Sequence, residues 1–465
     1  MTAILGIDLG TSQAKALLCA PDGTVLGQGA ASYPVVTPRD GWAESDPELW
    51  WRAVRSAVRE AKAGPAAAVG LGQSNAEVAA IGIAGQMHGV VLCNERTVAL
   101  RPAILWLDRR ASSEMKRYEL LTAAQVASLG SAPWPGTAGP MLLWLSRHEP
   151  GTYRAARWQL QPKDWLRFRL TGEVATDPTD ASATLLYDLP RDTWALDVVE
   201  SLGLRPDLLA PVRGSGEVSG ALLSGPAAEL GLAAGIPVVT GCADTAASLL
   251  AAGLTHPLEA GSGWALLTLG TGGQWIAPVD ALDPDPAGNA YLCRAVDGRY
   301  RLVGMQNVGV ALDWVRHMLG ASWDELYAAA AAARPAAAGT ASAARSPAAG
   351  LRFEPWLVSE RGRSGGGWTG ATLAHVREDL LRAALAGVAG LLRDGLDDLR
   401  AAGAAPRQVL LGGGGSGHPA WRALLAEVLG VPLHPASTPS LTARGATLLA
   451  QSALSGLGPL YRAMS

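Results

Sequence analysis

Residues 5–12 have the sequence Leu-Gly-Ile-Asp-Leu-Gly-Thr-Ser, and residues 265–272 have the similar sequence Ala-Leu-Leu-Thr-Leu-Gly-Thr-Gly. Each stretch is an apolar strand pattern that runs into a Leu-Gly-Thr turn. A strand pattern repeated in the second half of a chain predicts two similar domains, each about half the chain long. We place the boundary near Gly241, which gives domains over residues 1–241 and 242–465.

The segments around these two stretches alternate between strand and helix patterns. Apolar runs predict strands at residues 4–9, 14–20, 25–27, 78–83, 236–240 and 409–411. Asp46 followed by Pro47 predicts the start of a helix over residues 47–62, because Asp is a good N-cap and Pro suits the first helical position. A long amphipathic helix is predicted from Leu373 to Leu399, ended by Gly403. The alternation predicts an α/β fold.

Composition and charge exclude several classes of function. Lys and Arg total 38 against 41 Asp and Glu, a net charge of −3, so the chain has no basic surplus for binding nucleic acid. The N-terminal segment lacks a basic region, and no apolar stretch reaches membrane-spanning length. We therefore expect a cytoplasmic protein with neither nucleic acid nor membrane as a partner.

The four cysteines are far apart in the sequence and form no Cys-x-x-Cys pair. This spacing suits neither a zinc cage nor a disulfide scaffold, so we expect four buried free thiols. The histidines include no pair at i and i+4, which argues against a zincin-like metal site.

The glycine-rich run at residues 412–417 follows a strand pattern and precedes a helix expected from Pro419. It matches Gly-x-Gly-x-x-Gly, but residues 435–438 lack the acidic residue that a dinucleotide site needs for ribose. None of the four lysines follows a glycine, which excludes a Walker A loop. A strand ending in glycines still lets an anion or a nucleoside approach the backbone closely. A plain flexible turn is the alternative.

The two Leu-Gly-Thr turns are candidate phosphate-contacting hairpin tips, with plain hairpin turns as the alternative. Asp8 lies on the strand that feeds the first turn, and Thr268 takes that place before the second. A carboxylate beside a phosphate is repulsive unless a divalent cation lies between them. The sequence thus predicts that the first turn holds Mg²⁺ and the second contacts phosphate alone.

Polar side chains follow two further strand patterns. Asp244 follows the strand at 236–240 and precedes a helical run, so it is either an N-cap or a general base at a strand end. His88 follows the strand at 78–83, where α/β proteins bind ligands, although a lone histidine is more often structural. Gln86, Asp108 and Arg110 add the donors and acceptors that hold a polyhydroxylated molecule.

Several motifs resemble the FGGY carbohydrate kinases, and within that family the xylulokinases. The likeness extends over nearly the whole chain, in the same order and with similar spacing. The matching stretches are Ile7–Ser12, Trp42–Pro47 with Trp50 and Trp51, Gly85–Gly89, Arg101–Trp106, Gln161–Arg167, Gly241–Asp244, Leu269–Gly272 and Gly412–Gly414.

The resemblance implies two ribonuclease-H-like domains of the sugar kinase and actin type, with ATP and a sugar meeting in the cleft between them. It further implies transfer of the ATP γ-phosphate to the terminal hydroxyl of D-xylulose, with the first domain on the sugar side and the second on the nucleotide side. The implied roles are Asp244 as general base, Asp8 acting through Mg²⁺, Gln86, Met87, His88, Asp108 and Asp244 at the sugar, Thr11, Ser12, Gly270, Thr271 and Gly272 at the phosphates, and Gly413 and Gly414 at the adenosine.

The sequence departs from the family at two positions near the implied sugar site. The family usually has Asn where this chain has Leu107 and Thr245, and residues 362–367 replace its usual Thr-Pro. Another ketopentose or polyol, such as ribulose, L-xylulose or arabitol, therefore stays open as the substrate. A homodimer is also left open.

Two functions of other classes can be weighed against a kinase. A catalytically idle sugar-binding sensor would explain the altered Leu107 and Thr245, but Asp8 and Asp244 are both present. A serine hydrolase is suggested by Gly-x-Ser-x-Gly at residues 362–366, but the strand and helix that should flank it are missing from the pattern. The alanine-rich residues 328–350 predict a helix end and a surface loop without a chemical role.

Overall fold

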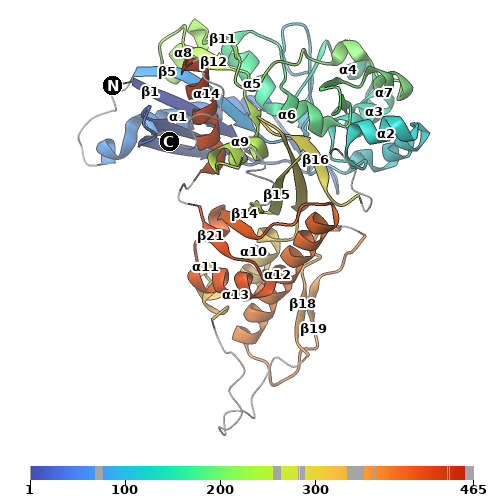
Figure 1. The fold of residues 1–465 in the computed structure, drawn as a ribbon, viewed down its shortest axis with the longest axis vertical. Helices are drawn as coiled ribbons and strands as arrows, with labels where there is room; N and C mark the ends of the chain where they lie inside the picture. Colours follow the sequence, from blue (N-terminus) through green and yellow to red (C-terminus); the bar gives the residue numbers. More distant parts are fainter. Residues whose placement is uncertain are drawn as a thin grey trace.

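The computed structural model describes residues 2–68, 77–254, 263–280, 282, 288–331, 350–360, 362–436, 438 and 440–455. Two β-sheets form the centres of two regions, one broad with many helices and one narrower (Figure 1). Within the described residues, none of the helices combines the length and the apolar character needed to cross a bilayer. The four cysteines are free and buried, as predicted.

The first sheet has the strand order β11-β12-β5-β1-β2-β3, with β13 also paired to β5. Its strands are β1 (Thr2–Leu9), β2 (Gln13–Cys19), β3 (Val25–Ser32), β5 (Glu77–Gly85), β11 (Val218–Ala221), β12 (Pro237–Val239) and β13 (Cys242–Ala243). β1 pairs parallel with β5 and antiparallel with β2, so the Leu-Gly-Thr stretch at residues 9–11 turns between β1 and β2.

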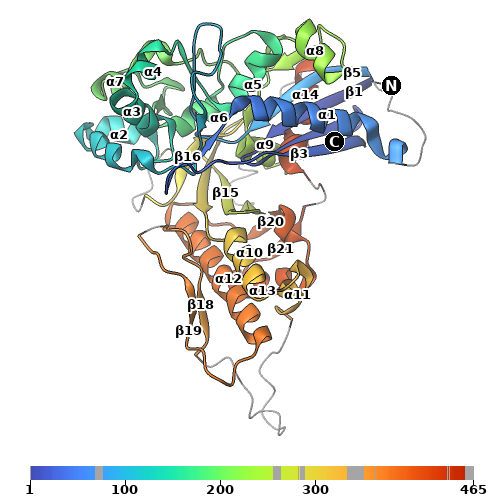
Figure 2. The same cartoon turned by 180° about the vertical axis from the view of Figure 1, so that it is seen from behind.

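Helices cover both faces of this sheet. Side chains alternate along a strand, and Leu5 and Ile7 of β1 pack into the core formed with α1 (Pro47–Ala68). Ile4 packs on the opposite face with α9 (Asp244–Ala251) and α14 (Leu441–Ser455). α9 and α14 face the viewer in Figure 1 and α1 does so in Figure 2.

Glycines allow the C-terminal helix to lie directly on the first sheet. A Cβ atom at Gly6 would collide with the carbonyl oxygen of Ala443, and one at Gly82 with that of Ala446. The last helix among the described residues, α14, therefore returns to the sheet that contains β1. The division of the chain at residue 241 stays a prediction.

The second sheet has the order β16-β17-β15-β14-β20-β21. Its strands are β14 (Trp264–Leu269), β15 (Gly273–Val279), β16 (Tyr291–Arg294), β17 (Arg299–Met305), β20 (Gln408–Gly412) and β21 (Leu433–Pro435). β14 pairs parallel with β20 and antiparallel with β15. This repeats the arrangement of β1 with β5 and β2, so the predicted pair of similar domains is confirmed as a mixed α/β fold with two sheet-containing domains.

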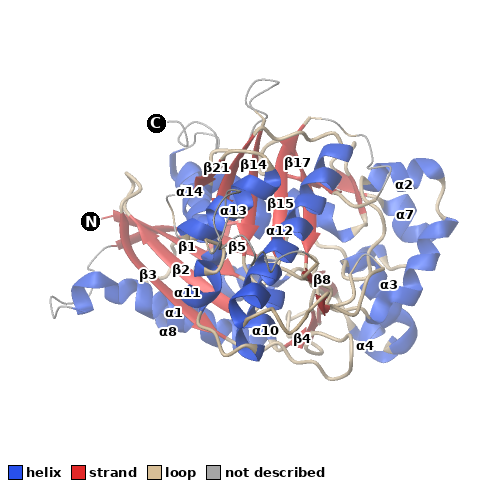
Figure 3. Cartoon of the chain, turned by 90° about the horizontal axis from the view of Figure 1, so that it is seen from below, coloured by secondary structure: helices blue, strands red, loops and turns tan. Residues whose placement is uncertain are grey.

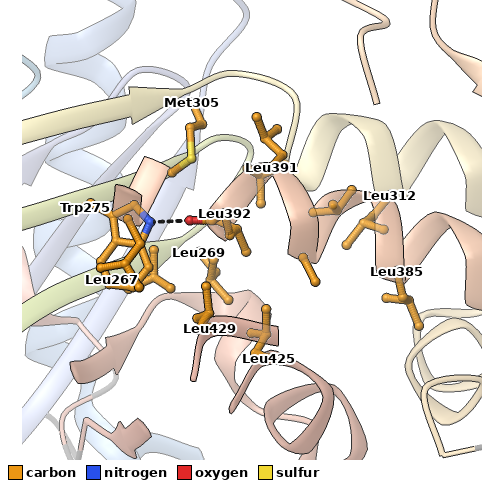
Figure 4. Packing of buried hydrophobic residues seen from close by; sticks show 14 of the residues in the cluster. Leu267, Leu269, Trp275, Met305, Leu312, Leu385, Leu391, Leu392, Leu425 and Leu429 are labelled. Carbon is orange, nitrogen blue, oxygen red and sulfur yellow. Dashed lines mark hydrogen bonds between the residues drawn. The ribbon is translucent and has the colours of Figure 1, made fainter. Parts of the chain in front are cut away.

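Three helices, α10 (Gly309–Met318), α12 (Arg377–Ala401) and α13 (Pro419–Leu429), build the core of the second region against its sheet. Figure 4 shows leucines of α12 and α13 meeting Leu267, Leu269 and Met305 of the strands. The indole Nε1 of Trp275 donates to the Leu392 carbonyl at 2.8 Å, which satisfies the one polar atom of this buried ring.

The remaining elements are short, and many of them form a helical lobe beside the first sheet, where α2, α3, α4 and α7 gather in Figure 3. The helices are α2 (Ala123–Leu129), α3 (Ala138–His148), α4 (Pro150–Ala155), α5 (Pro162–Thr171), α6 (Pro178–Ala181), α7 (Leu196–Ser201), α8 (Ser224–Leu230) and α11 (Trp323–Ala328), with 3₁₀ turns η1 (Arg110–Leu120), η2 (Ser182–Thr184), η3 (Pro206–Leu208) and η5 (Gly414–Ser416). The minor strands are β4 (Glu44–Ser45), β6 (Val91–Cys93), β7 (Ala103–Ile104), β8 (Trp158–Leu160), β9 (Tyr187–Asp188), β10 (Thr193–Trp194), β18 (Arg352–Glu354) and β19 (Gly367–Thr369).

The predicted strands and the helix start at Pro47 are confirmed, and Asp46 caps that helix through Glu48 N at 3.0 Å. The predicted start of the long helix at Leu373 is wrong. α12 begins at Arg377, and Leu373 is fully exposed, because the apolar pattern continues into a loop that does not pack. Most of the alanine-rich stretch, residues 332–349, lies outside the described residues.

Candidate active site

The carboxylates of Asp8 and Asp244 are brought to the same end of the first sheet. Asp8 pairs with Ala84 of β5 in the parallel register, and Ala243 pairs with Gly85 on the other side of β5. Asp8 alternates with Leu9 and therefore points to the face that α9 covers, and Asp244 is the first residue of α9. The helix thus starts at Asp244 rather than after it, with Ala243 as the N-cap residue.

Burial raises the pKa values of both carboxyl groups, and the charge of Asp8 adds to the shift of Asp244. Burial raises the pKa of Asp8 to about 6, partly opposed by the charge of Lys15. Burial, followed by the negative charge of Asp8, raises the pKa of Asp244 to about 7. A carboxylate with a pKa near the working pH is suited to accept a proton during catalysis.

The surroundings of these carboxylates fit a divalent cation. The Lys15 ammonium lies 4.0 Å from Asp8 Oδ2, too far for a direct hydrogen bond. Asp244 Oδ1 accepts from Thr245 N at 2.7 Å, and its second oxygen has no partner among the described residues. The described part of the chain holds no group of three or more metal-ligating side chains, but Mg²⁺ usually takes one or two carboxylates together with waters and substrate phosphates.

The loop after β5 presents Gln86, Met87 and His88 beside this pair. Gln86 N donates to Leu9 O at 2.9 Å, which joins the loop to the end of β1, and the buried Gln86 Oε1 has no partner in the described structure. His88 has a φ of 69°, a conformation that is rare outside glycine and is found at functional sites. Each of these features is consistent with a ligand-binding loop.

His88 is held as a neutral acceptor. Burial lowers the pKa of His88 to about 4, so the ring is uncharged at neutral pH. Its Nδ1 lies 2.7 Å from the carbonyl oxygen of Ala183, a contact that requires the proton on Nδ1. The Nε2 atom is then left with a lone pair that can accept a hydrogen bond from a hydroxyl group.

Thr245 connects the two regions of the molecule. Its Oγ1 lies 2.5 Å from the hydroxyl of Tyr300 on β17 and 3.0 Å from the sulfur of Met87. All three side chains are buried. Thr245, one of the two departures from the family pattern, is therefore packed as a bridge between the Met87 loop and the second sheet.

Asp108 is placed in an ion-pair network. Its two oxygens accept from the Arg110 guanidinium at 2.7 and 2.9 Å and from Ala43 N at 2.6 Å. Arg110 also pairs with Glu44 and stacks over Trp42 at 3.6 Å. A contact between Asp108 and a sugar stays a prediction, since protein donors already engage both carboxylate oxygens.

The two Leu-Gly-Thr turns are hairpin tips, as predicted. Thr11 Oγ1 accepts from the indole of Trp106 at 2.8 Å, and the side chain of Ser12 is exposed. In the second turn Gly270 N donates to Gly272 O at 2.8 Å, and Gly270 and Thr271 are exposed. Contacts between these residues and phosphate stay predictions.

Gly413 packs against the second turn. It has a φ of 88°, and a Cβ atom there would collide with the carbonyl oxygen of Leu269, the residue before Gly270. A Cβ atom at Gly414 would meet nothing within 4 Å. The structure thus places Gly413 against the turn at residues 270–272 in the second region, with Gly414 next in the chain. Asp8, Thr11, Gln86, Met87, His88 and Asp244 lie at or next to strand ends of the first sheet.

Several residues that connect the two sides were not anticipated. Arg109 Nη2 donates to Gln306 Oε1 at 2.8 Å, and Gln306 follows the Met305 carbonyl that lies against Gly272. Trp134 lies edge-on to His88 with a centroid distance of 5.9 Å and contacts Tyr291 of β16 at 6.3 Å. No local sequence pattern marks these contacts, because each joins residues more than 30 positions apart.

Family models describe both regions of the chain. The N-terminal domain of the FGGY family of carbohydrate kinases matches residues 3–251, and its C-terminal domain matches residues 265–454. This chain belongs to the FGGY family of carbohydrate kinases. The kinase is therefore a phosphotransferase, and the family's phosphoryl donor, ATP, is its substrate.

Named relatives cover almost the whole kinase. Xylulose kinase of Escherichia coli (strain K12) is 35% identical over 437 residues, which are 92% of this chain and 85% of the relative. Xylulose kinase of Bacillus subtilis (strain 168) is 29% identical, with 97% of this chain and 88% of the relative covered. The crystal structure of xylulose kinase from Rhodospirillum rubrum superimposes with a TM-score of 0.80 at 29% identity, covering 97% of this chain and 90% of that one.

Proposed function

We propose that this kinase transfers the γ-phosphate of ATP to the terminal hydroxyl of D-xylulose, forming D-xylulose 5-phosphate and ADP, with Asp244 as the general base. The pair of raised-pKa carboxylates at one end of the first sheet carries the proposal. The names of the relatives favour D-xylulose as the acceptor.

Asp244 acts on the sugar hydroxyl. Its open carboxylate oxygen accepts the hydroxyl proton as the sugar oxygen forms its bond to the γ-phosphorus, and the bond from phosphorus to the β,γ-bridging oxygen breaks to release ADP. The hydrogen bond from Thr245 N at 2.7 Å holds the other oxygen and fixes the carboxylate orientation. A positioned base of this kind contributes about 10²- to 10⁴-fold in rate.

Asp8 would hold Mg²⁺ together with the phosphates of ATP. When bound, the cation would neutralise charge on the phosphates near Asp8 and orient the γ-phosphate. Among the described residues, Asp8 meets one cationic side chain, that of Lys15, which is 43% exposed and 4.0 Å away. A carboxylate so sparsely neutralised is suited to a metal ion.

Three side chains of the loop after β5 would orient the sugar. His88 Nε2 is an acceptor, the unpartnered Gln86 Oε1 is another, and Met87 supplies an apolar contact fixed by Thr245. On the nucleotide side, the turn at Gly270–Gly272 would contact phosphate, and Gly413 and Gly414 would border the adenosine. Water would be excluded as the two regions close around both substrates, which favours transfer to sugar over hydrolysis.

The substrate is tested by ADP release from the purified kinase with Mg²⁺-ATP and a panel of D-xylulose, L-xylulose, D-ribulose, L-ribulose, glycerol, xylitol and D-arabitol. We expect D-xylulose to give the highest kcat/KM. Another leading sugar would overturn the substrate assignment and direct attention to Leu107 and Thr245. Sugar binding without ADP release, in folded protein that binds ATP, would favour the idle sensor instead.

A further inference from the structure

The segment Asp177–Thr184 contacts His88 and the residue before Asp244, two of the groups predicted to lie at the sugar. It contains the short helix α6 and the turn η2, and every side chain in it except that of Pro178 is buried. Near its end the carbonyl of Ala183 holds the His88 ring at 2.7 Å. Near its start the hydroxyl of Thr179 accepts from Ala243 N at 2.7 Å, directly before Asp244.

The hydroxyl of Thr179 has a defined polarity. It lies 2.7 Å from Asp177 Oδ2, and a carboxylate can only accept, so Thr179 donates its proton there and offers a lone pair to Ala243 N–H. Ser215 Oγ donates to the same Asp177 oxygen at 2.6 Å, and Ser215 O accepts from Gly241 N at 3.0 Å. Asp177 therefore supports two points of the chain that leads into Asp244.

A buried charge cluster in turn fixes Asp177. The Lys163 ammonium, fully buried, lies 2.9 Å from Asp177 Oδ1, 2.6 Å from Asp164 and 3.0 Å from Asp180. Arg167 joins Asp164 at 2.8 Å and donates to Thr240 O at 3.1 Å. Ion pairs between fully buried groups hold their geometry strictly, because breaking one leaves an uncompensated charge.

Gly85 allows the same charge cluster to pack closely against the end of β5, where the Gln86-Met87-His88 loop begins. A Cβ atom at Gly85 would lie 3.0 Å from Lys163 Cβ and 3.3 Å from Leu9 O. Gly85 precedes the Gln86-Met87-His88 loop, and Leu9 follows Asp8. The buried charges of Lys163, Asp164, Arg167, Asp177 and Asp180 thus lie next to the end of β5 and, through Thr179, to the start of α9.

We propose that Thr179 is a positioning residue for the general base: its hydroxyl, oriented by Asp177 and Lys163, fixes the backbone at Ala243 and thereby the carboxylate of Asp244. The proposal rests on the proposed role of Asp244. The carboxylate sits one residue beyond the Ala243 N–H, so loss of this bond shifts the base relative to the sugar hydroxyl, and misplacement of about 1 Å can cost about 10²-fold in rate.

The test compares four variants by kcat, the KM for each substrate and the thermal midpoint. Thr179→Val keeps the shape and removes the hydroxyl, Thr179→Ala removes it without adding a methyl group beside Asp177, and Thr179→Ser restores it. The matched control is Thr171→Val. Thr171 is also buried, and its hydroxyl likewise donates to an oxygen, Arg167 O at 2.9 Å, and accepts from a backbone N–H, that of Glu173 at 3.1 Å.

We expect Thr179→Val and Thr179→Ala to lower kcat at least tenfold while the KM for ATP changes less than about threefold. Thr179→Ser should recover kcat to within about threefold of the parent, and Thr171→Val should keep kcat at a similar loss of thermal midpoint. Should the valine variant not fold, the alanine variant decides the question.

Either of two results would overturn the proposal: kcat of Thr179→Val and Thr179→Ala within threefold of the parent, or a loss of kcat in these two variants no larger than that of Thr171→Val at the same thermal midpoint. Asp244→Asn, measured alongside, separates the general-base role of Asp244 from the positioning role of Thr179. Full turnover by Asp244→Asn would refute the general base itself, whereas an inactive Asp244→Asn with active Thr179 variants would refute only the positioning role.

Discussion

The end of β1 and the end of β14 occupy equivalent places in the two sheets, yet they carry different chemistry. Asp8 faces Lys15 across the first hairpin, and Thr268 faces Gln274 across the second, with 4.0 Å between the charged groups and 3.4 Å between the neutral ones. The same backbone arrangement thus presents a buried carboxylate in one half and a neutral hydroxyl in the other.

The loops after the neighbouring parallel strands extend this contrast. After β5 the chain places three side chains, those of Gln86, Met87 and His88, and after β20 it places the glycines at residues 413–415. Side chains can position a base, a cation and a small polar substrate, whereas bare backbone suits phosphates and a flat nucleoside. A duplicated fold can therefore divide two substrates between its halves by changing the residues at two strand ends.

The largest effect in this comparison is expected from making the first turn neutral like the second. Asp8→Asn keeps the shape of the side chain and removes its charge, so the site loses the carboxylate proposed to hold Mg²⁺. We expect kcat to fall at least about 10²-fold. Steady-state ADP release measures it, and a kcat within threefold of the parent would contradict the role of Asp8.

The pH profile of kcat/KM, which reports the groups of the free enzyme, is the next test. Asp244 must be deprotonated to accept a proton, and burial together with the charge of Asp8 raises its pKa to about 7. Activity should therefore be full at high pH and lost as the pH falls through 7, about tenfold lower at pH 6 than at the plateau. In Asp8→Asn the residual activity should be lost at a lower pH, because one cause of the raised pKa of Asp244 is gone. An unchanged or higher pH of half-maximal activity would contradict the effect of Asp8 on Asp244.

Gly413→Ala tests the bare backbone of the second half. The added methyl group meets the Leu269 carbonyl, and alanine resists a φ of 88°, so the turn must shift. We expect the KM for ATP to rise about fivefold with the KM for sugar unchanged. Gly417→Ala is the matched control, since Gly417 has no proposed contact with the nucleotide and its Cβ atom would meet nothing within 4 Å; equal effects of the two variants would argue against a specific nucleotide contact at Gly413.

Thr268→Asp places a carboxylate before the second turn, at the position equivalent to Asp8 before the first, and should have the smallest effect. The new carboxylate would lie beside a turn proposed to contact phosphate, without a lysine opposite it. We expect the KM for ATP to rise about threefold through like-charge repulsion, and less at high salt. A lower KM would indicate that the second turn also accepts a cation.

Local sequence patterns were sufficient for the hairpins, the helix start at Pro47 and the strand ends that carry Asp8, His88 and Asp244. These features depend on short-range rules of alternation, capping and turn formation. The false helix start at Leu373 shows the limit of such rules, because an amphipathic pattern does not reveal which residues find a core to pack on.

The buried contacts that hold the site residues in place could not be predicted in the same way. Lys163, Thr179 and Tyr300 each act through partners far away in the sequence, such as Asp177, Ala243 and Thr245. A lysine next to an aspartate at residues 163–164 and the Asp-Pro-Thr-Asp stretch at residues 177–180 were the available signals, but burial and pairing of these charges depend on the assembled sheet. The engagement of Asp108 by Arg110 and Ala43 is likewise visible only in three dimensions, and its contact with a sugar stays a prediction.

The most direct measurement is a single turnover of Asp244→Asn, with rapid mixing of enzyme, Mg²⁺-ATP and D-xylulose and quantification of sugar phosphate. Calorimetric titration should first show that the variant binds both substrates with Kd values within about threefold of the parent. The account predicts that the bound substrates then react at least about 10²-fold more slowly. Formation of sugar phosphate at the parent rate would contradict the assignment of Asp244 as the base and, with it, the division of labour between the two halves.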